Sequence, residues 1–202
     1  MMRTKTAKRR LSALGAVLAV WLGGGCGAAG TGDIPAVTGF DSEKYLGVWH
    51  EAARLPQWFE RDTVGVTATY TAMDDGRIKV VNRGWRNGEP VGAEAVAVFR
   101  GSPDVGWLRV SFFRPFYGDY KIILLAPDYS SAIVTSSRRD SLWILSRTPE
   151  LPPDVMADYL ARTAAWGFDN SKLEFPGPAP EIAPASEIAP APEIAPAPVQ
   201  QD

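Results

Sequence analysis

The central part of this chain is a series of short segments in which apolar and polar residues alternate, each separated from the next by turn-forming residues. Residues 64–70 alternate in this way, Asp74-Asp75-Gly76 follows, and residues 78–83 alternate again. A period of two places every second side chain on one face of a β-strand. Asp-Gly and Asn-Gly pairs favour the tight turns that join antiparallel neighbours. The pattern predicts an antiparallel meander.

Eight segments of this kind occur in succession. Eight antiparallel strands can close into a barrel, which removes exposed sheet edges and leaves room for one small ligand. The predicted strands cover residues 48–55, 64–70, 78–83, 93–100, 107–112, 120–125, 132–135 and 142–147.

One helix is predicted after the last strand. Pro152-Pro153-Asp154 suits a first helical turn, because proline already has the required φ and a carboxylate is favoured near the positive end of a helix. Val155, Tyr159 and Trp166 form an apolar stripe that would pack on the barrel wall, and Gly167 is the expected end. The predicted fold class is therefore all-β: an eight-stranded antiparallel up-and-down barrel with one C-terminal α-helix on its wall and a short strand at 172–175.

The aromatic residues mark the extent of the folded core. Twenty of the 21 lie between Phe40 and Phe175, so we expect the barrel and its helix to occupy residues 38–175. Residues 176–202 hold eight of the 17 prolines and repeat Glu-Ile-Ala-Pro with a period of six. Proline interrupts both helix and sheet, so this segment is predicted to be a disordered Pro/Ala/Glu repeat tail. The alternative is an arm that binds peptidoglycan or another partner.

The first 25 residues have the composition of an export signal. Five basic residues precede an apolar stretch at 11–22, which is too short to span a bilayer comfortably. Gly23-Gly24-Gly25 then leads to Cys26, the only cysteine of the chain. This arrangement resembles a bacterial lipoprotein signal, although Leu22 lies four residues before the cysteine rather than the usual three. The resemblance implies acylation of Cys26, a lipid-anchored linker at 26–37 and a location in the bacterial outer membrane.

Composition excludes several other classes of function. A single cysteine and a single histidine, His50, cannot supply a cysteine- or histidine-rich metal site, and we predict no metal and no cofactor. The formal net charge of −2 does not suggest a nucleic-acid-binding protein, and removal of the basic signal would make the chain more acidic. No Gly-x-Ser-x-Gly motif or phosphate-binding loop is present. The chain is therefore not expected to be an enzyme.

Two separated motifs resemble the lipocalin family. Tyr45-Leu46-Gly47-Val48-Trp49 is similar to its first motif, and residues 142–149, which include Arg147, are similar to its third. Asn82-Arg83-Gly84 and residues 110–118 are similar to the bacterial outer-membrane lipocalins of the apolipoprotein D group. The likeness extends from about Phe40 to Phe175. It implies a barrel with an apolar interior and assigns Gly47, Trp49 and Arg147 to the fold signature, with the arginine packed across the indole.

Alternation then predicts which side chains line the interior. Lys79, Arg83, Glu94, Arg109 and Lys121 should face water, which turns their neighbours inward, and Ala53 should share the inward side with Trp49. Glu51 either forms a structural salt bridge or meets a cationic head group. The predicted ligand-binding residues are Glu51, Val66, Ala68, Tyr70, Val80, Asn82, Ala97, Phe99, Val110, Phe112, Tyr120, Ile122, Trp143 and Leu145.

An apolar and aromatic lining with few polar groups suits an acyl chain. The function predicted from the residues and the resemblance together is a membrane-anchored lipocalin that binds a fatty acid or lysophospholipid for storage, transport or membrane maintenance. Two alternatives are a tethered structural lipoprotein with a passive barrel and a tetrapyrrole carrier. Pairing of two barrels into a homodimer is left open.

Overall fold

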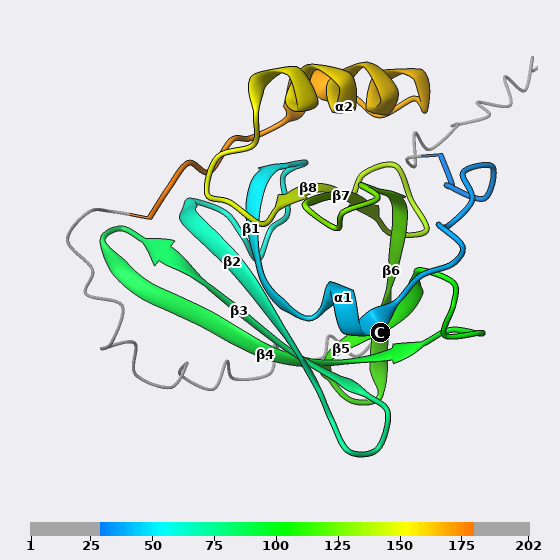
Figure 1. The fold of residues 1–202 in the computed structure, drawn as a ribbon. Coiled ribbons are helices and arrows are strands. Elements are labelled where there is room, and N and C mark those ends of the chain that lie inside the picture. Colours follow the sequence, from blue (N-terminus) through cyan, green and yellow to red (C-terminus); the bar gives the residue numbers. More distant parts are fainter. Residues whose placement is uncertain (1–28, 180–202) are drawn as a thin grey trace, which may run out of the picture.

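Eight antiparallel strands form a closed barrel in the computed structural model, which describes residues 29–179 (Figure 1). Each strand pairs with the next along the chain, and the last pairs with the first. The predicted eight-stranded up-and-down barrel is confirmed. The strands are β1 (Gly47–Arg54), β2 (Thr63–Ala72), β3 (Ile78–Arg86), β4 (Glu89–Phe99), β5 (Trp107–Phe113), β6 (Phe116–Leu125), β7 (Ser131–Thr135) and β8 (Leu142–Ser146).

The two ends of the barrel differ. The short helix α1 (Ser42–Tyr45) lies across the ring of strands at the end where β1 begins, and we call this the closed end (Figure 1). Since the strands alternate in direction, the connections after β1, β3, β5 and β7 all lie at the opposite end, which we call the loop end. Those four connections are residues 55–62, 87–88, 114–115 and 136–141.

The C-terminal helix α2 (Pro153–Ala165) packs outside the ring, beside β7, β8 and β1 (Figure 1). The buried Tyr159 contacts the wall there and its hydroxyl is 2.7 Å from Ser131 Oγ. Gly167, with φ of +80°, follows the helix as predicted. The strand expected at 172–175 is wrong: the chain forms a 3₁₀ turn, η1 (Asn170–Lys172), and then a single β-bridge between Glu174 and Arg54.

Apolar side chains gather in two clusters, one inside the barrel and one between its wall and α2. Ala53 was predicted to point inward with Trp49, but it belongs to the outer cluster. The register of β1 against β8 shifts between Glu51 and Ala53, and a one-residue shift reverses which side chains face the interior. The simple alternation rule therefore fails over the last residues of β1.

The segment before α1 lies along the outside of the barrel. Val37 N–H donates to Ile122 O, and Lys121 Nζ donates to Thr31 O at 2.8 Å. Lys121 was predicted to face water, yet it is only 2% exposed. It does point away from the interior cluster, but residues 29–37 cover it, which alternation within one strand cannot reveal. Burial lowers the pKa of Lys121.

One arginine holds this N-terminal segment in place. The Arg139 guanidinium donates to the carbonyl of Gly30 and to both carboxylate oxygens of Asp33, and its Nε donates to Trp166 O at 2.6 Å. These hydrogen bonds lower the pKa of the Asp33 carboxyl. The 136–141 loop, the N-terminal segment and the end of α2 are thus joined through one side chain.

The predicted signal peptide, Cys26 and residues 180–202 of the predicted tail lie outside the described residues. Within residues 29–179, no helix is long and apolar enough to cross a membrane.

We predict that Arg139→Ala will loosen the N-terminal segment without unfolding the barrel. Loss of the bonds to Gly30, Asp33 and Trp166 should speed amide hydrogen exchange in residues 29–37 by about tenfold, while the strands keep their protection. Arg138→Ala is the matched control, since that side chain pairs with the exposed Asp140. Equal exchange in both variants would contradict the role assigned to Arg139.

Candidate ligand-binding site

Most of the predicted ligand-binding side chains lie in or against the cluster inside the barrel. Val66 is also buried, and Asn82 pairs with Ala68 across β2 and β3, on the same face as Val80. The structure does not bring Phe112 into this group: it is 40% exposed, and the register of β5 against β6 shifts beside it. The predicted residues in or against the cluster are Ala68, Tyr70, Val80, Ala97, Phe99, Val110, Tyr120, Ile122, Trp143 and Leu145.

Three tyrosines join their hydroxyl groups inside the barrel. Tyr120 Oη is 2.8 Å from Tyr45 Oη and 2.7 Å from Tyr70 Oη. Burial raises the pKa of all three hydroxyls, so they stay neutral and polar. Tyr45 was not predicted as a site residue because it belongs to α1, which precedes the first strand. The sequence holds one indication that Tyr45 lies near the site, namely that it precedes Trp49 by four residues. In the structure Trp49 Nε1 donates to Tyr45 O at 2.8 Å.

Arg147 closes this end of the barrel. Its guanidinium carbon lies 3.9 Å from the ring centroid of the fully buried Trp49. The same group donates to three backbone carbonyls, Val48 O, Lys44 O and Tyr129 O, at 2.9, 2.7 and 3.2 Å. Gly47 has φ of +94°, and a side chain there would lie against Arg147 Nη1. The cation is thus held over the indole by α1, β1 and the loop before β7.

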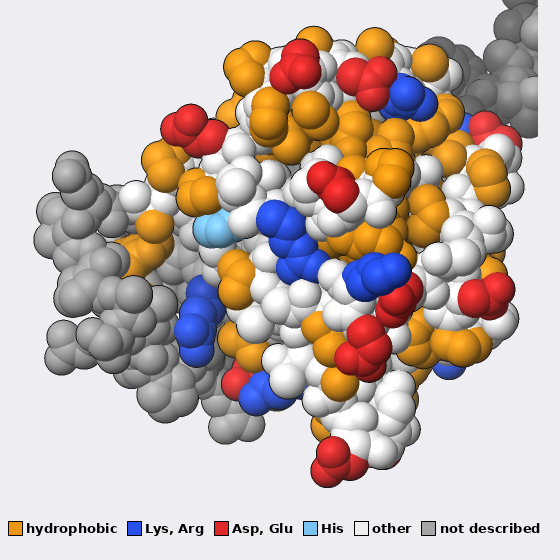
Figure 2. Space-filling view, in the orientation of Figure 1, with side chains coloured by type: hydrophobic (Ala, Val, Ile, Leu, Met, Phe, Trp, Pro, Cys, Tyr) orange, Lys and Arg blue, Asp and Glu red, His pale blue; other side chains and the backbone are white. Residues whose placement is uncertain are grey.

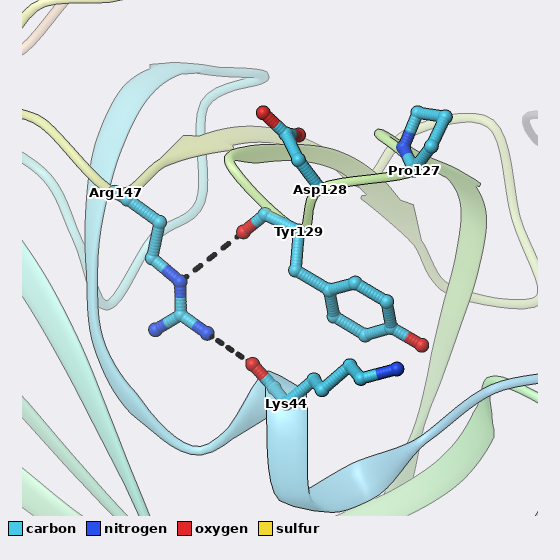
Figure 3. Close-up of a pocket in the computed structure, with 5 residues that line it drawn as sticks. All are labelled: Lys44, Pro127, Asp128, Tyr129 and Arg147. Atoms are coloured by element: carbon cyan, nitrogen blue, oxygen red, sulfur yellow. Dashed lines mark hydrogen bonds between the residues drawn. The ribbon is translucent and has the colours of Figure 1, made fainter.

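A shallow pocket of about 410 Å³ lies on the outer side of this closure (Figure 3). Three of the five residues that line it are charged, and Figure 2 shows basic and acidic side chains interspersed over this face. The carboxylate of Asp128 already accepts two hydrogen bonds from Ser130, and these bonds lower the pKa of the Asp128 carboxyl. These charged groups make the pocket a poorer match for an acyl chain than the apolar cluster inside the barrel. Its lining residues are Lys44, Pro127, Asp128, Tyr129 and Arg147.

A buried charged cluster lies toward the other end of β1. Arg54 Nη1 donates to Glu51 Oε1 at 2.8 Å, and its Nη2 donates to Glu60 O, also at 2.8 Å. Arg54 Nε reaches Glu174 at 2.9 Å, and Trp143 Nε1 donates to Glu60 Oε2 at 3.0 Å. Glu51 and Trp143 were predicted, and the salt bridge of Glu51 was one of the two roles considered for it. Arg54 and Glu60 were missed, because the shifted register and the 55–62 loop bring them together.

The cluster contains three carboxyl groups around one guanidinium. Burial raises the pKa of Glu51 to about 8, and the nearby Glu60 carboxylate adds to this effect while Arg54 opposes it. Burial likewise raises the pKa of Glu60. At neutral pH the cluster therefore holds a proton that ordinary glutamates would have released.

Side chains that could take part in catalysis or metal binding do not lie in this charged cluster. His50 lies one position from Trp49 on β1, on the opposite face, and partial burial lowers its pKa. Among residues 29–179 there is no group of three or more side chains suited to hold a metal ion. A second pocket, of about 310 Å³, lies between Glu51 and Ala52 of β1, Met156 of α2 and residues 175–178.

Comparison with known proteins agrees with this architecture. The model of the lipocalin-like domain matches residues 40–178. The chain belongs to the lipocalin family. It is 45% identical over 141 residues to outer membrane lipoprotein Blc of Escherichia coli strain K12, a match that covers 69% of this chain and 80% of the relative. Blc of Vibrio cholerae is 40% identical over 143 residues, which is 69% of this chain and 84% of the relative.

More distant lipocalins share the fold. Apolipoprotein D of Rattus norvegicus is 34% identical over 136 residues, covering 60% of this chain and 68% of the relative. The structure of insecticyanin from the tobacco hornworm Manduca sexta superposes with a TM-score of 0.57 at 22% identity, and covers 71% of this chain and 84% of that one. At this identity the superposition supports the barrel fold alone.

We predict that Arg147→Ala will lower the stability of this lipocalin more than its affinity for a ligand. The variant loses the contact over Trp49 and the bonds to three carbonyls, so the free energy of unfolding should fall by about 2 kcal/mol. The dissociation constant should change less than about threefold, because the guanidinium lies at the outer side of the closed end. Denaturant melts and ligand titrations on the same sample compare the two effects, and the opposite order would refute the assignment.

Stability should fall as the pH rises through the titration of Glu51. The native carboxyl keeps its proton up to about pH 8, whereas an unfolded glutamate releases it near the ordinary value of 4.5. Between these values the native state binds more protons, so raising the pH favours unfolding, by about 4 kcal/mol between pH 5 and pH 9. Glu51→Gln should flatten this dependence in denaturant melts. A wild-type stability that rises over this range would exclude a raised pKa.

Proposed function

We propose that this lipocalin is anchored in the outer membrane through acylated Cys26 and binds a single-chain lipid inside its barrel. The observation that carries the proposal is the distribution of polarity over the inward side chains. Apolar groups such as Val80, Ala97 and Leu145 form most of the inner lining, the three tyrosine hydroxyls lie toward the closed end, and the Arg54 cluster lies toward the loop end. An acyl chain needs the former, and the polar groups then orient its head.

Partial exposure of the inner face supports entry of a ligand. Ala68, Phe99, Val110 and Trp143 pack against the inner cluster, yet each is only half-buried. Side chains of the inner face that solvent reaches are accessible to a ligand as well. This feature favours a binding protein over the passive structural barrel considered from the sequence.

The anchor is proposed from the sequence and from the names of relatives. The Blc proteins of Escherichia coli and Vibrio cholerae are named outer membrane lipoproteins, and Cys26 follows an apolar segment and three glycines in this chain. Each acyl chain on the cysteine would contribute about 0.8 kcal/mol per buried CH₂, and several chains together make a stable anchor.

The charged cluster favours a lysophospholipid over a free fatty acid. Arg54 already donates to Glu51, Glu60, Thr63 and Glu174, so its guanidinium has little capacity for a ligand carboxylate. The surrounding carboxyl groups can instead accept hydrogen bonds from an ammonium group, such as that of an ethanolamine head.

Filling the interior should abolish binding. In Ala68→Phe the new ring enters the inner cluster and competes with the acyl chain, so affinity for a fluorescent fatty acid should fall at least about tenfold. Thr69→Phe is the control on the same strand with the opposite orientation, and it should bind as the wild type does. Both are compared by fluorescence titration of the full chain.

The same titration distinguishes the two lipids. Lysophosphatidylethanolamine should displace the probe at a lower concentration than palmitate does, if the cluster recognises an ammonium group. Absence of saturable binding at micromolar concentrations, where a control lipocalin binds, would reject the proposed function. Stronger displacement by palmitate would reject the head-group assignment alone.

A further inference from the structure

The chain after η1 crosses the outside of the barrel from β1 to β2. Glu174 forms a β-bridge with Arg54, at the end of β1. Gly65 N–H of β2 then donates to Gly177 O at 3.2 Å, and Pro176 between these two contacts is buried. The start of the C-terminal tail is therefore attached to the barrel wall (Figure 1).

Gly65 permits the close approach of this segment. Its φ is +58°, and it lies where the register of β2 against β3 shifts between Val64 and Thr67. A Cβ atom at this position would overlap the backbone of Ala179, so only glycine lets the two chains come this close. The described chain ends here, against β2, and residues 180–202 follow it.

The next strand, β3, presents an aromatic and a basic side chain on its outer face. Trp85 and Arg83 have the opposite orientation to the residues of β3 that belong to the inner cluster. Trp85 is half-buried and Arg83 is exposed. No acidic side chain among residues 29–179 forms a salt bridge with Arg83, whereas Lys79 on the same face pairs with Glu94 at 2.9 Å.

The sequence beyond Ala179 carries complementary groups. Residues 180–202 contain four acidic residues and no basic one, and their Glu-Ile-Ala-Pro repeat begins at Glu181. Three residues complete a turn of polyproline II helix, the conformation that proline-rich sequences favour, so the six-residue period equals two turns. In that conformation the three glutamates share one edge, and the three isoleucines, beginning with Ile182, share the next edge.

The first repeat is within reach of both side chains of β3. Neighbouring strands lie about 4.8 Å apart, and a polyproline II chain advances about 3.1 Å per residue. Two residues beyond Ala179 therefore bring Glu181 about as far as the next strand. Opposite charge favours a position beside Arg83, and aromatic side chains such as Trp85 are the surfaces that proline-rich segments bind.

We propose that residues 180–184 dock on the outer face of β3, with Glu181 beside Arg83 and Ile182 against the indole of Trp85. The occupant of this face is the tail of the same chain, because Ala179 already lies on the neighbouring strand and only a few further residues need to be ordered. The later repeats then leave the barrel from β3, on the side of the ring opposite β7. This contact requires neither a lipid anchor nor a bound ligand.

A single fluorophore on the tail can report the contact. Cys26→Ser removes the only native thiol, so that Ala183→Cys in the full chain carries one bimane label, which tryptophan quenches only at short range. We expect the fluorescence of the label to rise at least about twofold when Trp85→Phe is added. Fluorescence that does not respond to Trp85→Phe overturns the proposal.

Charge reversal separates docking from mere proximity. Arg83→Glu should release the label from quenching by about as much as Trp85→Phe does, and Glu181→Arg in the same chain should restore the quenching. Lys79→Glu is the matched control, since it makes the same change of charge on the same face of β3 and should leave the quenching unchanged.

Two other outcomes would also overturn the proposal. Quenching that depends on Trp85 but not on Arg83 would mean that the tail is only held nearby by its attachment at Gly65. Quenching that disappears on dilution of the labelled protein would assign the outer face of β3 to the tail of a second copy.

Discussion

Pairing of β1 with β8 is the contact on which the remaining architecture depends, because it closes the sheet and brings the first and last strands together. At one end of this seam Arg147 reaches across to the indole of Trp49 and to three carbonyls. Toward the other end the register shift turns Ala53 to α2 and leaves Arg54 beside Glu51. One seam thus provides both the closure and the charged cluster.

The polar groups of the two ends differ in kind. At the closed end the three tyrosine hydroxyls bond to one another and stay neutral, so little desolvation cost remains there. Toward the loop end, Arg54 pairs with the carboxylates of Glu51 and Glu174, the Glu60 carboxyl lies nearby, and the pKa of Glu51 is raised. In the proposed function the head group is recognised at the end that holds the charged side chains, whereas the chain lies against the apolar lining.

Sequence reasoning succeeded where a property is local to one strand. Period-two alternation gave the number of strands, and the separated Trp49 and Arg147 motifs indicated that the first and last strands meet. It failed where distant segments meet. Lys121 is buried by residues that precede β1, Glu174 pairs with Arg54 across 120 positions, and the bulge in β1 becomes visible only against β8. Side chains of this kind are set by pairing register and by covering segments, neither of which is encoded in the spacing of one strand.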